Sequence, residues 1–163
     1  MNFWKRFSQL NARQLYRFAL LFLSQPLLIV PVLTATLKTF SICNSLYGNA
    51  HQGNGKANGF RHALWNALVC KNSYRFIKNK QKTVFFAQEL TDLYENVTKN
   101  EILDRTMDLH NNMLGRVCFL NYLDKKNEEM IEFLQKKAEI SKFCTKIEEI
   151  NIAENQIVYI SED

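Results

Sequence analysis

Short polar side chains recur at helical spacing in three stretches of the chain. In NGFRHALWNAL (58–68), Asn58, His62 and Asn66 fall at i, i+4 and i+8 and therefore share one face of a helix. The opposite face is apolar and can pack in a core. Asn and His have only moderate helix propensity, so helix propensity does not explain a row of them. Such departures from local propensity are typical of functional sites.

The same arrangement returns twice further along the chain. A second row contains Asp108, Asn111 and Asn112, and a third contains Asp92 and Glu95. Three helices that each carry one polar row are what a polar pocket inside a helical bundle requires. We therefore predict an all-α fold, a compact multi-helix bundle around a polar pocket, with a short irregular or β-like C-terminal tail.

The most apolar stretch, residues 18–37, has no charged residue and is long enough to span a membrane. Pro26 and Pro31 interrupt it, and a proline inside a helix removes a hydrogen bond and bends the chain. We expect a helix to about Gln25, a break, and a second helix from Pro26 or Pro31 to about Tyr47. A buried helical hairpin is favoured over a membrane-embedded or membrane-surface element and over a cleaved leader.

The remaining pattern predicts a loop, four helices and a tail. Residues 48–59 are rich in Gly and Asn and form the loop, which brings Asn58 near the N-cap of the next helix. Residues 2–10 form a short amphipathic segment that is basic and aromatic. The helices are expected at about 58–74, 83–97, 101–123 and 126–139, and the tail at 146–162 forms one or two short strands or stays loose.

At 163 residues the chain is predicted to be one helical domain. Its parts are a hydrophobic lead-in (1–47), a core that bears the polar rows (58–123), and a C-terminal helix and tail (124–163). The four cysteines are spread widely with no CxxC pair, which favours reduced, buried thiols over a zinc site or a disulfide framework.

Charge is distributed unevenly along the chain. Residues 1–88 carry twelve Lys or Arg and no acid, whereas residues 89–163 carry nine bases and sixteen acids, so the net charge of +5 divides into +12 and −7. A basic half with many aromatic residues indicates contact with an anionic lipid or membrane surface, or with nucleic acid. Nucleic acid is the weaker alternative because no recognised motif supports it. The alternative is that the two halves neutralise each other in the fold.

The polar rows contain the groups that acid–base chemistry needs. Imidazole, the side chain of His62, has an unperturbed pKa near neutral pH in general, and a carboxylate can orient such a ring or bind a cation. Amides and Arg61 can donate hydrogen bonds to a phosphate or a developing oxyanion. The alternative is a buried hydrogen-bond network that holds helices together. We predict as catalytic His62, Asp92, Glu95 and Asp108, and as substrate-binding Asn58, Arg61, Asn66, Asn111 and Asn112.

The chain lacks the usual signatures of a metal site or a serine hydrolase. There is no HExxH, no cluster of His and Cys, and no GxSxG. We predict no metal site and no cofactor, although carboxylate and amide oxygens would suit Ca²⁺ or Mg²⁺.

The blocks NGFRHALWNAL, AQELTDLYE and MDLHNNMLGR resemble a bacterial family of small helical domains of unknown function. Its members carry N-G-x-x-D-A-F-R-H-A-x-W-N, A-x-x-F-T-D-A-H-E and M-D-x-x-N-N-x-x-G. The resemblance covers roughly 58–116. The family's Asp before A-F-R-H corresponds to Asn58 or is absent, and the His of its H-E pair is Tyr94. FRHALWN is also similar to the RHDxxYRN helix of microbial phospholipases A2, but Ala63 replaces the calcium-binding Asp, so no calcium mechanism is carried over.

Such domains are distantly similar to Wnt-like helical domains directed at lipids, which implies headgroup or phosphoester chemistry. We therefore expect a hydrolase or transferase that acts on lipid headgroups or related phosphate-bearing substrates at a membrane surface. It would be cytoplasmic or membrane-associated, and a protein inhibitor would be its partner if it is toxin-like. The alternative is a non-catalytic, membrane-associated interaction domain with a structural polar network.

Overall fold

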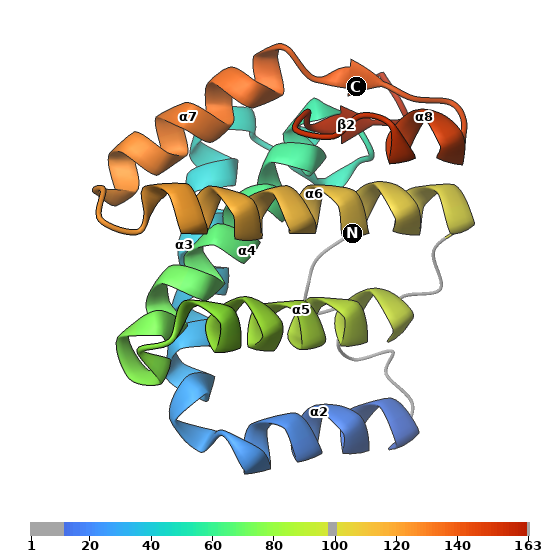
Figure 1. Cartoon of the computed structure of the whole chain (residues 1–163). Helices are drawn as coiled ribbons and strands as arrows, with labels where there is room; N and C mark the ends of the chain where they lie inside the picture. Colours follow the sequence, from blue (N-terminus) through green and yellow to red (C-terminus); the bar gives the residue numbers. More distant parts are fainter. Residues whose placement is uncertain (1–11, 98–100, 163) are drawn as a thin grey trace.

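Long helices make up most of the structure, a computed structural model that describes residues 12–97 and 101–162 (Figure 1). The predicted segment 2–10 lies outside the described residues. The all-α prediction is confirmed. The long helices are α2 (Ala12–Ser24), α3 (Ile29–Tyr47), α4 (Lys56–Ile77), α5 (Lys80–Val97), α6 (Ile102–Tyr122) and α7 (Asn127–Glu139). The short elements are η1 (Pro26–Leu28), η2 (Ala50–Gln52), β1 (Lys142–Phe143), α8 (Ile147–Asn151) and β2 (Val158–Tyr159).

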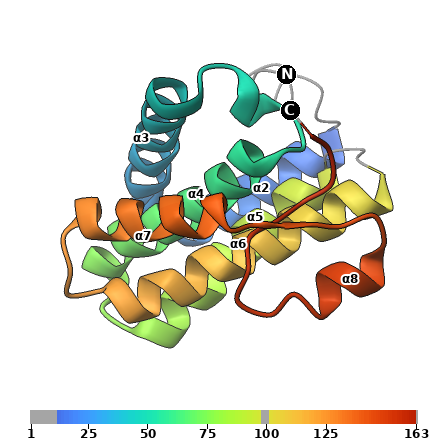
Figure 2. The ribbon, with the colours of Figure 1, turned by 90° about the horizontal axis from the view of Figure 1, so that it is seen from above.

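Helix α4 is the centre of the fold. It packs against α3, α5, α6 and α7, and Figure 2 shows it passing beneath α7 and beside α6. Its first four turns are buried on nearly every side, including the polar row at Asn58, His62 and Asn66. A buried helix must satisfy its polar side chains inside the protein. The neighbouring helices therefore have to supply partners for this row.

Two glycines allow the close packing that brings the polar rows together. A Cβ atom at Gly115 of α6 would lie 2.1 Å from the backbone oxygen of Ala63 in α4, and 2.8 Å from Cβ of Asn66. A Cβ atom at Gly59 would lie 2.6 Å from Cγ2 of Ile157 in the C-terminal segment. Glycine at these two positions lets α6 and the C-terminal segment approach α4 directly.

The break predicted in the apolar stretch is confirmed. Helix α2 ends at Ser24, Pro26 begins η1, and Pro31 lies in the first turn of α3, where a missing amide costs little because such amides have no partner within the helix. One face of α3 packs on α4 and the other is exposed. The segment Pro26–Tyr47 is long and apolar enough to cross a membrane, but core helices and signal sequences share this property, and 39% of its most apolar part is buried.

The chain between α3 and α4 and the C-terminal tail differ from expectation in detail. The N-cap of α4 is Gly55, so Asn58 lies in the first turn, where its side-chain amide donates to the backbone oxygen of Gly53. The expected tail contains strand β2, which pairs in parallel with β1, and the helix α8, which was not predicted. Ile157 and Val158 of this tail are fully buried.

Candidate active site

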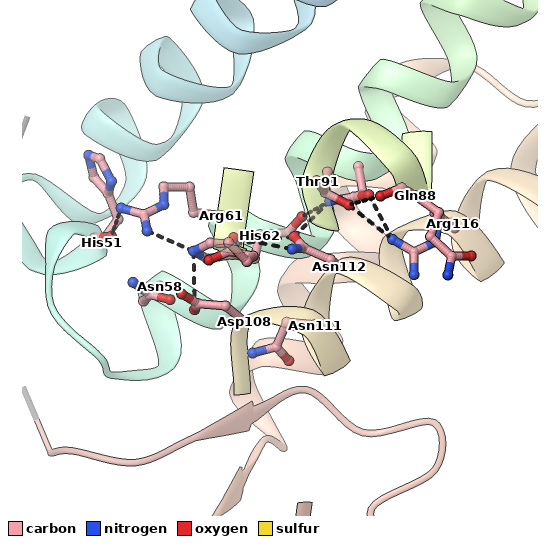
Figure 3. Close-up of polar contacts among 12 residues, drawn as sticks. His51, Asn58, Arg61, His62, Gln88, Thr91, Asp108, Asn111, Asn112 and Arg116 are labelled. Atoms are coloured by element: carbon pink, nitrogen blue, oxygen red, sulfur yellow. Dashed lines mark hydrogen bonds and ion pairs between the residues drawn. The ribbon is translucent and has the colours of Figure 1, made fainter. Parts of the chain in front are cut away.

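The three polar rows meet around the imidazole of His62 (Figure 3). Helix α4 supplies His62, α5 supplies Glu95, and α6 supplies Asp108 and Asn112. The imidazole, the amide and the two carboxylates come together because α4 packs against both α5 and α6. The predicted convergence of the rows on one place is therefore seen directly for these four residues.

The inner ring nitrogen of His62 faces two acceptors. Nδ1 lies 3.2 Å from Oδ1 of Asn112 and 3.6 Å from Oε1 of Glu95. The Asn112 side chain is held in turn, because its Nδ2 donates to Oε1 of Glu95 over 3.4 Å. Since both atoms that face Nδ1 are oxygens, we infer that Nδ1 carries the hydrogen and that the other ring nitrogen is the basic one.

The outer ring nitrogen has one partner for each of its protonation states. Nη2 of Arg61 lies 2.9 Å from Nε2 and donates to it when the imidazole is neutral. Oδ1 of Asp108 lies 3.2 Å from Nε2 and accepts its hydrogen when the imidazole is protonated. A ring nitrogen with a donor and an acceptor beside it can take up and release a proton without losing all its contacts.

A second part of the network lies deeper between the helices. Asn66 donates from Nδ2 to Oδ1 of Asn112 over 2.6 Å and accepts from Nη1 of Arg116 over 3.2 Å. The same Nη1 lies 3.3 Å from Oγ1 of Thr91. Burial lowers the pKa of the Arg116 guanidinium, and the carboxylate of Asp92 opposes this shift. The network thus ties α4, α5 and α6 together behind the imidazole.

Arg116 and Thr91 were not among the predicted site residues. A signal for Arg116 was present, because it follows Asn112 by four residues and Asp108 by eight and so continues the polar row of α6. Thr91 precedes Glu95 by four residues and continues the row of α5 in the same way.

Three predicted residues lie outside the contacts of His62. Asn111 turns to the C-terminal strand, where its side chain donates to the backbone oxygen of Val158 over 2.9 Å and accepts from the backbone nitrogen over 3.0 Å. Asp92 is only partly buried, and its carboxylate acts on the charge of Arg116. Asn58 is buried on the Asp108 side of His62, and its Oδ1 has no hydrogen-bond partner among the described residues.

The cluster is closed, with one side chain leading outward. His62 is 3% exposed, Glu95 0% and Asp108 3%. Arg61 is partly exposed, and its Nη1 donates to the backbone oxygen of His51 over 2.6 Å. The guanidinium of Arg61 thus links Nε2 of His62 to the backbone of His51.

The same three residues are a candidate for a metal site. One ligand atom from each of His62, Glu95 and Asp108 lies within 4.8 Å of the others. The two carboxylates, however, face opposite nitrogens of the ring, and a single ion binds along the lone pair of only one nitrogen. The positive guanidinium of Arg61 beside Nε2 also opposes a cation there.

The rings of the other two histidines bond to partners outside this cluster. Nε2 of His110 donates to the backbone oxygen of Gln156 over 2.9 Å, and burial lowers the pKa of the ring while that bond raises it. Nε2 of His51 lies 2.7 Å from Oδ1 of Asn44. All four cysteines are free and buried, as expected from their spacing.

Comparisons with known proteins place the chain in a family. No curated protein and no solved structure matches it. A family model described as a domain of unknown function (DUF6973) matches residues 19–142. The match covers all the residues around His62 and ends before strand β2. Because it extends over more than half of the sequence, the chain belongs to this family of domains of unknown function.

Proposed function

We propose that the protein is a hydrolase or transferase that acts on lipid headgroups or related phosphate-bearing substrates at a membrane surface. The observation that carries this proposal is the environment of His62. Each ring nitrogen has a carboxylate beside it, and the outer nitrogen is also covered by a partly exposed arginine. A general base needs these features: Nδ1 is oriented by a buried carboxylate, and Nε2 lies on the side of the partly exposed Arg61, from which a substrate would approach.

The roles of the residues follow from their positions. Glu95 and Asn112 hold the Nδ1 hydrogen, so Nε2 accepts the proton of the attacking water in a hydrolase or of the attacking alcohol in a transferase. Asp108 stabilises the imidazolium that forms. The proton then passes to the leaving oxygen as the phosphoester bond breaks, which returns His62 to its neutral state.

The substrate class is argued from Arg61 and from the charge of the chain. A guanidinium pairs with two oxygens of a phosphate, and phosphate binding would turn Arg61 away from Nε2 of His62. Asn58 offers a buried carbonyl oxygen near Asp108 that is available to a substrate hydroxyl. The twelve bases and no acids of residues 1–88 attract anionic headgroups.

A second candidate is a non-catalytic, membrane-associated interaction domain. The observation that favours it is the burial of the cluster together with the bonds that link Asn66, Asn112 and Arg116 across three helices. Buried polar networks of this kind hold helices in a fixed register. On this hypothesis the polar rows are needed for folding and not for chemistry.

The two candidates are separated by turnover and stability measured on the same variants. We would incubate wild type, His62→Asn and Asp108→Asn with mixed phospholipid vesicles and identify released products by mass spectrometry. His110→Asn is the matched control because this partly buried histidine lies outside the cluster. Loss of a general base typically lowers the rate by about 10²–10⁴-fold. We expect this loss in the two cluster variants and an unchanged rate in the control.

Variants of Asp92 and Glu95 refine the assignment. Glu95→Gln should lower turnover because it removes the charge opposite Nδ1, whereas Asp92→Asn should not, since no contact joins Asp92 to His62. If wild type releases no product and the cluster variants are only less stable, the enzyme proposal is wrong and the structural network stands.

A further inference from the structure

Large aliphatic side chains are exposed on α2, η1 and α3, which follow one another along the chain. We call this set the α2–α3 apolar face. Its members are exposed by 47% to 75%, and they are Leu20, Leu23, Leu27, Val30, Leu33 and Leu37. Leu20 and Leu23 are spaced to share a face of α2, and Val30, Leu33 and Leu37 a face of α3, whereas Leu28 and Val32 are buried against the fold. Large apolar surfaces that are left exposed mark interaction sites.

Basic side chains surround this face. Arg17 and Lys38 are exposed at its two ends. The turn between α4 and α5 adds exposed bases and lies close to the start of η1, because Gln25, Lys82 and Phe85 line one cavity of about 520 Å³. The exposed bases at this turn and in the helix ends beside it are Arg75 of α4, Lys78 of the turn, and Lys80 and Lys82 of α5. Phe76 and Phe85 beside them are 53% and 61% exposed.

We propose that the α2–α3 apolar face docks on an anionic lipid bilayer. Aliphatic and aromatic side chains would enter the boundary between headgroups and acyl chains, and lysines would extend to the phosphates. Residues 1–88 contain no acid, and the exposed Glu89, which lines the same cavity as Lys82, is outnumbered by the exposed bases near it. A second copy of the chain is a poorer occupant, since a symmetric contact would bring two strongly basic halves together.

The structure indicates a helix that lies on the bilayer and does not cross it. The inner face of α3 is fixed to α4, where Nε1 of Trp65 donates to Oγ1 of Thr36 over 3.0 Å and Nδ2 of Asn72 donates to the backbone oxygen of Pro31 over 3.3 Å. Crossing would require α3 to leave α4 and expose the core. Docking uses only the side chains that are already exposed.

The docked face leads toward the His62 cluster. The exposed residues of α3 are mostly aliphatic up to Leu37 and mostly polar from Lys38 onward, with Thr34 and Leu46 as the exceptions. At the polar end, Asn44 contacts His51, whose backbone oxygen accepts from Arg61. The bilayer would therefore lie along the helix that ends beside Arg61. That a headgroup reaches His62 from there rests on the proposed function, whereas docking itself does not.

The test uses the full chain and vesicles of phosphatidylcholine, either alone or mixed with phosphatidylglycerol, in a sedimentation assay. The face variant is Leu23→Glu/Leu27→Glu/Val30→Glu, in which the replaced side chains are 66–75% exposed. The control variant is Ile102→Glu/Ile140→Glu/Ile152→Glu, in which they are 68–74% exposed on other elements. We expect wild type and control to bind the anionic vesicles at least about tenfold more tightly than the face variant.

A charge variant tests the second part of the contact. Lys78→Gln/Lys80→Gln/Lys82→Gln should bind anionic vesicles more weakly than wild type and with a smaller dependence on salt, because fewer charges are screened. Wild type should bind vesicles of phosphatidylcholine alone at least about tenfold more weakly than the anionic mixture.

The proposal is wrong if the face variant binds as wild type does, if the control loses binding equally, or if wild type binds neither vesicle. It is also wrong if light scattering shows a wild-type dimer that the face variant converts to a monomer while no vesicle binding is seen. His62→Asn should bind vesicles as wild type does. Binding without turnover would leave docking in place and contradict only the enzyme proposal.

Discussion

Replacing Gly115 by alanine tests the contact that brings the polar rows together. The new Cβ atom would lie 2.1 Å from the backbone oxygen of Ala63, whereas ordinary contact begins at 3.4 Å, so α4 and α6 must separate by about 1.3 Å, which is 3.4 minus 2.1. No side-chain rotation relieves a clash with a backbone atom. The separation would also stretch the 2.6 Å bond between Asn66 and Asn112 beyond hydrogen-bond distance.

The magnitude follows from three contributions to the free energy of unfolding. Overpacking of a core costs about 1–3 kcal/mol, and a buried polar group that loses its partner costs about 1–3 kcal/mol. The higher helix propensity of alanine raises the free energy of unfolding by about 1 kcal/mol relative to glycine. The net loss is about 3 kcal/mol, which for a chain of this size lowers Tm by about 6–12 °C.

The assay is thermal and urea unfolding of wild type, Gly115→Ala and Gly48→Ala. At Gly48 no atom lies within 4 Å of the added Cβ, but φ is +55°, so the cost there is backbone strain of about 1–2 kcal/mol. We expect Gly115→Ala to be the less stable variant and to lose any turnover that wild type shows. A Gly115→Ala protein as stable as wild type would refute the close approach of α4 and α6.

Three further outcomes are expected. Asn111→Ala removes both hydrogen bonds to the backbone of Val158 and should lower the free energy of unfolding by about 2 kcal/mol. Hydrogen exchange of the Val158 amide should then become about 30-fold faster. Unchanged exchange would contradict this contact. Burial raises the pKa of the thiols of Cys43, Cys70 and Cys118 from 9.0 to about 12, so the native protein should not react with a thiol reagent at pH 8, while the denatured chain reacts fully. The same shifts make stability depend on alkaline pH. Below pH 9 the thiols stay protonated in both the folded and the unfolded state, and between pH 9 and 12 only the unfolded chain releases these protons. The free energy of unfolding should therefore fall by up to about 1.4 kcal/mol per pH unit for each thiol. A Tm that stays constant over this range would contradict the burial of these thiols.

Much of the fold could be predicted from local patterns. The long helices, the break at Pro26 and the meeting of the polar rows follow from hydrophobic periodicity and from the conformational limits of proline. The helix α8 could not be found in this way, because five residues are too few to show a period. The N-cap at Gly55 was missed because Asn58 is the better capping residue by type, yet its side chain closes the preceding loop.

The site could be predicted only in part, because rotation about a helix axis is set by distant partners. Asn111 and Asn112 are neighbours on α6, and periodicity does not decide which of them faces His62. The side chain of Asn111 bonds to the backbone of Val158, 47 residues further along the chain, whereas the side chain of Asn112 bonds to His62. In the same way, Glu95 reaches His62, and Asp92 on the same helix does not. The degree of closure around His62 also depends on tertiary packing.

The most direct test of the account is the release of products from mixed phospholipid vesicles by wild type and by His62→Asn, with the free energy of unfolding of both proteins measured in the same buffer. The account predicts a product from wild type that carries the cleaved or transferred headgroup, and a loss of at least about 100-fold in His62→Asn while that variant remains folded. Release at the same rate by both folded proteins, or by neither, would contradict the assignment of His62 as the general base of a lipid-directed enzyme.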